Sequence, residues 1–414
     1  TTPAGDAPVY EKQTLALPDK PSIAVLPFAN MSGDPEQEYF SDGIAEDIIT
    51  ALSRMPWFFV KARNSTFTYK GRAIQVKAVS KELGARYVIE GSVRKSGDRV
   101  RITVQLIDAE NDKHLWAERY DRELKEVFAV QDEITERIVA SIAPGFLSAE
   151  MQRAHRKPAP NLGAWDHFMR ALWHFARFNR EDSVEAKRRV QKAIELDPRG
   201  AVYSGLLAII LVIEWLYGWH EHDSEALTEA RRAAERAITL DDHNAQARRA
   251  LGLVNLYSRR HDQAIRDFKQ ALELCPTEAE NHALLGTTLG LAGDYLIGLR
   301  HVEEALRLSP RDTFRATWFN NLAMAASAAG DDKASVDWAR KAIETNPTLP
   351  GGYRSLAASA GNLGRRSQAR AALETLCELL PGLTVAHAKA RLPFKNSADL
   401  ERYLDGLRKA GLPE

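Results

Sequence analysis

The sequence has few cysteines and no excess of charge. Its 414 residues include two cysteines, Cys275 and Cys377, which form neither a metal-binding pattern nor a disulfide framework. Lys and Arg number 56, as do Asp and Glu, so no net field attracts the chain to nucleic acid or acidic lipid. We therefore expect two buried thiols in a reducing cytoplasm, no cofactor, and no nucleic-acid or membrane partner for this region.

No segment has the features of a signal peptide or a clear membrane span. Residues 1–20 are polar, contain prolines, and are interpreted as a linker. The most apolar stretch, residues 200–219, is about as long as a spanning helix but carries Glu214. Because it is in phase with the repeats described below, a buried repeat helix is favoured over a membrane span.

Motifs of common catalytic sites are also missing. The sequence contains no Gly-x-x-x-x-Gly-Lys-Ser/Thr loop and no Gly-x-Ser-x-Gly turn. The His-Glu-His-Asp run at residues 220–223 could offer metal ligands, but a solvated turn is favoured because no other ligand is evident. The basic segment 151–160 is interpreted as part of a connector, 146–160, with a phosphate-contacting patch as the alternative.

Residues 21–145 have the pattern of an α/β domain with a mixed sheet, in the order β-α-β-α-β-β-β-α. A buried strand is expected at 22–28, followed by a helix that begins at Ser41 and runs to about residue 55. A second strand at 57–62 and a second helix at 76–83 follow. Gly84 is expected to end this helix in a left-handed conformation.

Three strands and a final helix complete this predicted domain. The strands are expected at 87–93, 99–107 and 114–120, and the middle one alternates between apolar and polar residues. An apolar stripe from Val127 to Ile142 predicts the last helix. We expect it to stop at Pro144, because proline lacks the amide hydrogen that continues a helix.

The remaining sequence repeats one phrase, Ala-x-x-Leu-x-Pro, and its variants. The copies end at Pro198, Asp242, Pro276, Pro310, Pro347 and Pro381, in steps of 44, 34, 34, 37 and 34 residues. A period of this size predicts stacked helical units, about six between residues 161 and 383. Residues 384–414 are expected to supply a capping helix at 398–407.

Small residues recur within the units. Twelve residues before each closing residue stand Ala186, Ala230, Ala264, Gly298, Ser335 and Ala369. Such residues allow two helices to approach closely. Leu251-Gly252 and Leu285-Gly286 lie earlier in the third and fourth units. The pattern resembles the tetratricopeptide repeat, whose consensus places Leu-Gly in its first helix and proline at its end.

The first domain resembles a TolB N-terminal-like domain in its runs at 21–28, 39–53, 87–94 and 114–121. Its combination with tetratricopeptide repeats resembles the C-terminal region of rhizobial-type class III adenylate/guanylate cyclase proteins. In that family a cyclase domain or a winged-helix DNA-binding domain commonly precedes these parts. The resemblance therefore implies a regulatory region, with cyclase or transcription-regulator output as alternatives for the parent protein.

The leading hypothesis is a non-catalytic scaffold that binds a protein or peptide in the concave groove of the repeats. The repeat register predicts the residues that line this groove: Arg249, Leu253, Tyr257, Thr287, Asn320, Met324 and Arg354. The other hypothesis is an enzyme that uses the cleft of the α/β domain, with Asp42, Arg63 and Asn64 as candidates. No nucleophile–base pair supports this second hypothesis.

Overall fold

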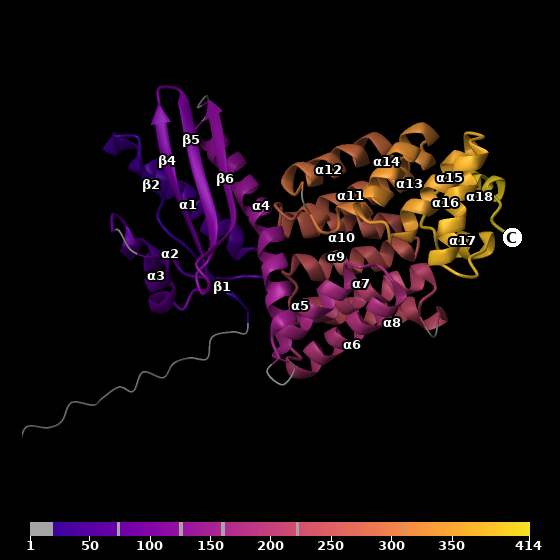
Figure 1. The fold of residues 1–414 in the computed structure, drawn as a ribbon, viewed down its shortest axis with the longest axis horizontal. Coiled ribbons are helices and arrows are strands. Elements are labelled where there is room, and N and C mark those ends of the chain that lie inside the picture. Colours follow the sequence, from indigo (N-terminus) through magenta and orange to yellow (C-terminus); the bar gives the residue numbers. More distant parts are fainter. Residues whose placement is uncertain (1–19, 73–74, 124–126, 159–161, 221–222, 311) are drawn as a thin grey trace, which may run out of the picture.

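A sheet region and a helical array make up the molecule, and one long helix lies between them (Figure 1). The computed structural model describes residues 20–72, 75–123, 127–158, 162–220, 223–310 and 312–414. The sheet region comes first in the chain, and the C-terminus lies at the far end of the helical array.

The sheet is mixed, as predicted. Its strands are β1 (Ser22–Val25), β2 (Ala29–Asn30), β3 (Phe59–Val60), β4 (Tyr87–Ser96), β5 (Arg99–Asp108) and β6 (Lys113–Glu123). The order is β3-β1-β4-β5-β6, and β2 also pairs with β4. β1 runs parallel to β3 and β4, whereas β4, β5 and β6 form an antiparallel meander. The alternation of β5 is confirmed, since Val100, Ile102, Val104 and Leu106 are buried.

The helices of this region are α1 (Glu38–Ser53), the short α2 (Arg63–Thr66), α3 (Val76–Leu83) and α4 (Val127–Arg156). Gly84 ends α3 with a φ of 59°, so its predicted left-handed conformation is confirmed. The predicted start of α1 at Ser41 is wrong. The helix begins three residues earlier, after a 3-10 turn at Pro35–Gln37, and Ser41 is buried within it.

The prediction that the last helix stops at Pro144 is also wrong. α4 continues through Pro144 to Arg156, which makes it 30 residues long. Proline removes one hydrogen bond, to the carbonyl of Ala140, but packing on both sides of that point compensates. The helix packs on α1, β6 and α5. Before the proline Gln131 bonds to Asp47 of α1, and after it Glu150 bonds to Trp165 of α5. Most of the predicted connector is therefore helix that belongs to both parts of the molecule.

The helical array consists, in the described residues, of six successive helix pairs. Their bounds are α5 (Ala164–Phe175) and α6 (Arg180–Leu196), α7 (Ala201–Tyr217) and α8 (Asp223–Leu240), α9 (Ala245–Tyr257) and α10 (His261–Leu274), α11 (Ala279–Leu291) and α12 (Tyr295–Leu308), α13 (Arg315–Ala328) and α14 (Asp332–Thr345), and α15 (Pro350–Asn362) and α16 (Arg366–Leu379). Each second helix ends two residues before the closing residue of its repeat. The repeated sequence motif thus marks the C-terminal end of every helix pair.

Small residues bring the two helices of a pair together. A Cβ atom added to Gly298 on α12 would collide with the backbone carbonyl of Gly286 on α11, and the reverse also holds. In the preceding pair, Gly252 on α9 leaves room for the ring of Phe268 on α10. Close helix contact at these positions is thus a steric requirement of the fold.

Contacts between distant repeats close the array on itself. The Thr348 hydroxyl donates to the carbonyl of Arg177 at 2.8 Å, although the two residues are 171 positions apart. Near the C-terminus, the Lys395 amide donates to the carbonyl of Leu291 at 3.2 Å. The last helices are α17 (Val385–Arg391) and α18 (Ser397–Ala410). α18 packs on both helices of the final pair and includes the predicted capping helix, and α17 packs on α18. These contacts bring the two ends of the array close to one another.

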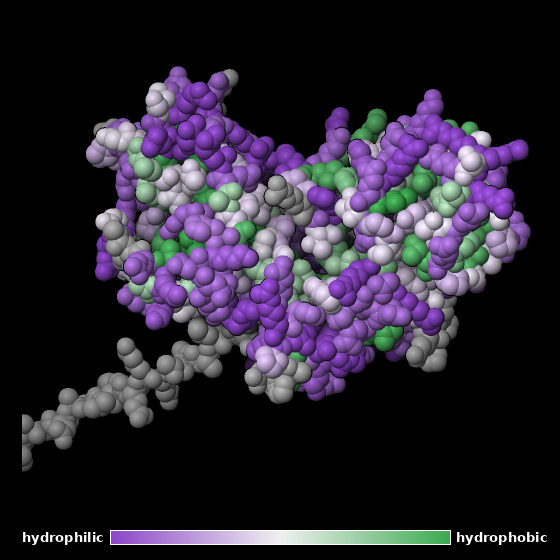
Figure 2. Space-filling view, in the orientation of Figure 1, coloured by the Kyte–Doolittle hydropathy of each residue, from purple (hydrophilic) through white to green (hydrophobic). Residues whose placement is uncertain are grey.

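The apolar stretch that includes Leu206 forms α7, whose residues are largely buried among the repeats. Among the described residues, no helix is long and apolar enough to cross a membrane. The face shown in Figure 2 is mostly hydrophilic, with separate small hydrophobic areas over both parts of the molecule. Cys275 is buried and Cys377 is partly buried, and both are free thiols.

Candidate binding site in the repeat interior

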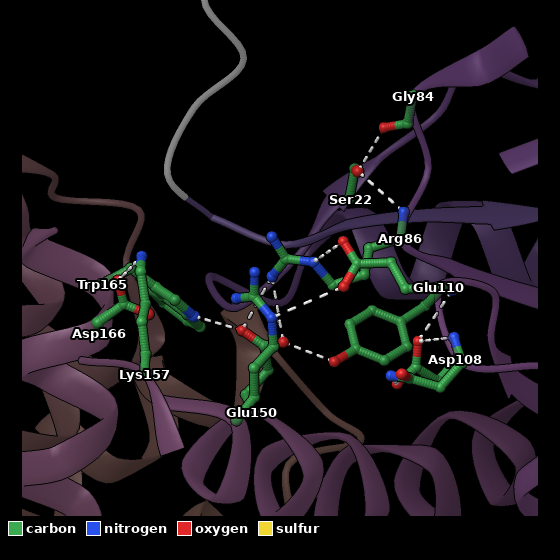
Figure 3. A network of polar contacts seen from close by, with 12 residues as sticks. Ser22, Gly84, Arg86, Asp108, Glu110, Glu150, Lys157, Trp165 and Asp166 are labelled. Carbon is green, nitrogen blue, oxygen red and sulfur yellow. Dashed lines mark hydrogen bonds and ion pairs between the residues drawn. The ribbon is translucent and has the colours of Figure 1, made fainter. Parts of the chain in front are cut away.

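A buried carboxylate joins the sheet region to the repeats. Glu150 lies on α4 and is 1% exposed. It accepts hydrogen bonds from the Tyr87 hydroxyl at 2.5 Å, from the Trp165 indole N–H at 2.7 Å and from the Arg86 guanidinium at 3.2 Å. Figure 3 shows Glu150 between Arg86 of the sheet region and Trp165 of α5. Since three groups from two parts of the chain converge on one acid, this buried hydrogen-bond network links the two parts.

Beside this joint the repeats enclose a cavity of about 180 Å³. Its walls come from α4, from the first helix of each of the six pairs, and from some of the loops between helices. Met55 and Trp57, which lie between α1 and β3 of the sheet region, also line it. The lining is largely apolar and includes Pro144, Leu147, Phe168, Leu206, Ile209 and Phe314. The cavity thus lies on the inner face of the array.

Five of the seven residues predicted for the groove line this cavity: Arg249, Leu253, Tyr257, Asn320 and Arg354. Thr287 and Met324 lie on the same inner helices but are not part of its lining. Thr287 donates its hydroxyl proton to the carbonyl of Ala283 at 2.8 Å, within its own helix. Six of the seven are less than 9% exposed, and Tyr257 is half-buried. The inner face is therefore largely buried, and the cavity on it is partly open.

Arg249 forms a buried ion pair. Its guanidinium contacts the carboxylate of Glu278, which lies in the loop before α11, and the side-chain oxygen of Asn281 at 3.4 Å. Arg249 is 7% exposed, so water screens this pair little. The primary role of Arg249 in the structure is to connect two neighbouring repeats.

Two further acids face the same part of the cavity. Burial raises the pKa of Glu280 to about 7, against the opposing effects of Arg249 and a hydrogen bond from the Trp318 indole. That bond measures 2.5 Å. Burial also raises the pKa of Asp312, which accepts from the Phe314 amide at 2.9 Å and from Ser309 at 3.0 Å. This end of the cavity is acidic, with a side chain that titrates near neutral pH.

Arg354 on α15 forms a contrasting end of the cavity. It is 3% exposed, and its Nε atom has no hydrogen-bond partner. Its Nη2 atom lies 4.0 Å from the sulfur of Met324, and its guanidinium carbon lies 6.0 Å from the ring centre of Tyr217. The Tyr403 hydroxyl also lies beside its side chain. No acidic side chain of the described residues forms an ion pair with it.

The residues proposed for an enzymatic cleft lie elsewhere, and two of them, Asp42 and Arg63, form ion pairs near the surface. Asp42 pairs with Lys70 at 2.5 Å, and Arg63 pairs with Glu46 at 3.0 Å and stacks on the ring of Phe67. Asn64 is exposed. These contacts supply no nucleophile–base pair among the three candidates.

The other candidate sites are not supported by clusters of ligands. The His-Glu-His-Asp run at 220–223 lies partly outside the described residues, and the described residues hold no group of three or more metal-ligating side chains. In the basic segment 151–160, Arg153 lies 3.8 Å from Glu110 and Lys157 pairs with Asp166. His155 stacks on Trp173. Its last residues, 159 and 160, lie outside the described part of the chain.

Sequence reasoning did not identify Glu280, Asp312 or the contribution of α4 to the cavity. Glu280 lies in the first turn of α11, where acids are common because of the helix dipole, and Asp312 lies in the loop before α13. α4 was missed because Pro144 was taken as its end. No pattern in the sequence indicates that this proline lines a cavity formed with the repeats.

Comparison with known proteins agrees with this architecture. A family model described as a tetratricopeptide repeat matches residues 245–278, which form the third helix pair, and similar pairs flank it. The helical part of this chain is built of tetratricopeptide repeats. Residues 19–137 match a model described as the second domain of HilA/YgeH-like transcriptional regulators. The tetratricopeptide array and the α/β region thus each have a counterpart in a known family.

Two curated relatives match more than half of this chain. The chain is 45% identical over 248 residues to Putative adenylate cyclase 3 of Rhizobium meliloti (strain 1021), covering 60% of this chain and 42% of that protein. It is 22% identical to the transcriptional regulator HilA of Salmonella typhimurium (strain LT2), covering 71% of this chain and 52% of that protein. The chain therefore spans about half the length of the curated relatives it matches.

Among solved structures, TolB from Acinetobacter baumannii resembles part of this chain, with 20% identity. The match covers 29% of this chain and 27% of TolB, with a TM-score of 0.22.

Proposed function

We propose that this chain is a non-catalytic regulatory region whose tetratricopeptide interior binds a protein partner. The observation that carries the proposal is that five predicted groove residues converge on one cavity: Arg249, Leu253, Tyr257, Asn320 and Arg354. A cavity of about 150 Å³ holds a benzene ring. One of about 180 Å³ therefore admits one large side chain or a chain end, and not an extended strand. The partner inserts such a group into the array.

The structure offers a route from this cavity to the sheet region. Pro144, Leu147 and Met151 of α4 line the cavity, and Glu150 on the same helix holds Tyr87 and Trp165. A group that enters the cavity therefore contacts the helix that packs on the sheet. We propose that this helix transmits occupancy of the cavity to an output domain of the parent protein.

A cyclase is the favoured output, because 45% identity to a protein of that name exceeds 22% identity to HilA. A winged-helix DNA-binding domain is the second candidate, and the match of residues 19–137 to the HilA-type domain supports it. The protein encoded by the complete gene can be assayed for ATP cyclisation and for DNA binding. Activity in one of the two assays identifies the output. If the protein is inactive in both assays, the proposal that this chain regulates a cyclase or a DNA-binding domain is contradicted.

Site-specific crosslinking tests partner binding. A photoreactive phenylalanine analogue replaces Tyr257, which lines the cavity and is half-buried, or Tyr39, which is 61% exposed on α1. We expect the Tyr257 site to crosslink one protein in cells and the Tyr39 site not to do so. The variant Leu253→Trp fills part of the cavity and should abolish that crosslink. Equal crosslinking with and without the tryptophan would contradict binding inside the cavity.

A further inference from the structure

Arg354 carries a buried charge that the described residues do not neutralise. Its guanidinium contacts a thioether, a tyrosine hydroxyl and an aromatic ring, but no carboxylate. Arginine stays protonated at any pH at which the protein is folded, so this charge cannot be lost by titration. A buried charge without a partner is among the most unfavourable features that a folded interior can contain.

The tyrosines around Arg354 do not supply the missing negative charge. Tyr217, Tyr257 and Tyr403 lie close enough to feel the charge of the guanidinium, and burial raises the pKa of all three. They are therefore neutral phenols at physiological pH. Their hydroxyl groups can solvate the guanidinium but cannot balance its charge.

Arg249 lines the same cavity, and its charge is neutralised by a carboxylate of the protein. It is similarly buried, at 7% exposed against 3% for Arg354, and it pairs with Glu278. The chain thus provides an internal acid for one cavity arginine and none, among the described residues, for the other. An anion from outside would complete the site at Arg354.

The cavity limits the size and polarity of that anion. Its lining is mostly apolar, and Leu216, Tyr217 and Tyr257 are among the lining residues, as is Arg354 itself. One guanidinium balances one negative charge, and its planar fork matches a carboxylate. Glu278, Glu280 and Asp312 also line the cavity, beside Arg249, and disfavour a second negative group there. These features select an apolar body with a single acidic end.

We propose that the cavity binds a small apolar monocarboxylate, whose carboxylate pairs with Arg354 and whose body fills the apolar lining. This inference rests on the proposed function in that the repeat interior is a binding site. It adds that a free organic acid occupies this site and competes with the protein partner for it. The chain would then sense such an acid.

Calorimetric titration of the full chain with hexanoate and benzoate tests the proposal. Hexanamide and benzamide are the matched neutral probes, nearly identical in shape. We expect both acids to bind and to raise the melting temperature, and the amides to bind at least about tenfold more weakly, because charge-assisted bonds are the stronger ones. In Arg354→Met the affinity for the acids should fall to that for the amides.

A second variant guards against misfolding. Arg354→Lys keeps the charge but loses the planar fork, so it should retain part of the acid affinity. Circular dichroism and thermal melting establish that each variant is folded. Equal binding of acids and amides, unchanged acid binding by Arg354→Met, or no acid binding at millimolar concentration would each overturn the proposal.

The two proposals can fail separately. If crosslinking from Tyr257 persists and saturating benzoate does not reduce it, the competing acid is refuted while partner binding stands. If the acids bind and no cavity-dependent crosslink forms, the protein partner is refuted while the ligand site stands. A peptide that ends in an apolar acid and binds where the free acids do not would also refute the free acid as ligand.

Discussion

Glu150 and Trp165 connect the two parts of the molecule, since the indole N–H donates to the buried carboxylate at 2.7 Å. Glu150 belongs to α4 and Trp165 to α5, the first repeat helix. The other carboxylate oxygen accepts the Tyr87 hydroxyl of β4. This one buried acid therefore has a partner in the sheet region and another in the repeats.

Replacing Glu150 should loosen this joint. Glu150→Ala leaves Arg86, Tyr87 and Trp165 without their shared acceptor, and loss of one partner of a buried ion pair costs about 3–5 kcal/mol. We expect a free energy of unfolding lowered by that amount in urea, and faster amide exchange in α4 and α5. Glu110→Ala is the matched control, because Glu110 pairs with the same Arg86 at 3.6 Å but is half-exposed. It should change stability by less than about 1 kcal/mol.

The contact between Gly298 and Gly286 should not tolerate a methyl group. Gly298→Ala places a Cβ atom against the carbonyl of Gly286, so α11 and α12 must move apart. Overpacking of this kind costs about 1–3 kcal/mol, measurable as a lower melting temperature. Gly205→Ala on α7 is the control, because the nearest atom to its added Cβ lies 3.7 Å away. Removing a helical glycine there should stabilise the protein by up to about 1 kcal/mol.

Glu280 should make stability depend on pH near neutrality. Burial raises its pKa from 4.5 to about 7, so the folded state binds its proton more tightly than the unfolded state. The free energy of unfolding therefore falls as pH rises from about 4.5 to 7. Glu280→Gln removes this effect and should be more stable than the parent by on the order of 2 kcal/mol at pH 8, with little difference at pH 4.5.

Urea unfolding at several pH values measures this difference. Arg249, Glu278, Asp312 and Trp318 also face Glu280 and should be left unchanged in the comparison. The exposed Glu273→Gln on α10 controls for the change in net charge. A Glu280→Gln difference that does not vary with pH would refute the assignment.

Arg249 and Arg354 should respond oppositely to removal of their charge. Arg249→Met leaves Glu278 buried without its partner and should cost about 3–5 kcal/mol. Arg354→Met removes a charge with no acidic partner among the described residues, and should be neutral or stabilising in the absence of ligand. Denaturant unfolding of both variants gives the comparison. Similar destabilisation by both would show that Arg354 is balanced within the protein.

The sequence determined the repeat architecture, because every unit needs small residues where its two helices meet and a residue that ends its second helix. Ala271 and Ala305 are fully buried where the helices meet, and Pro276 and Pro310 follow each exit. The sequence also determined the alternation of β5 and the left-handed end of α3 at Gly84, which depend on local residue chemistry. The register identified Leu253 and Arg354 as inner-face residues for the same reason.

Only the tertiary structure decided what the inner face becomes. A hydrogen bond between Thr348 and Arg177, 171 positions apart, joins distant repeats, so that the predicted groove becomes a cavity. No local sequence pattern predicts a contact between residues so far apart in the chain. Packing on both sides carries α4 past Pro144, where the local rule predicts an end. Arg249 and Arg354 are equivalent in the repeat register, and only the three-dimensional neighbours give one an acid and leave the other without one among the described residues.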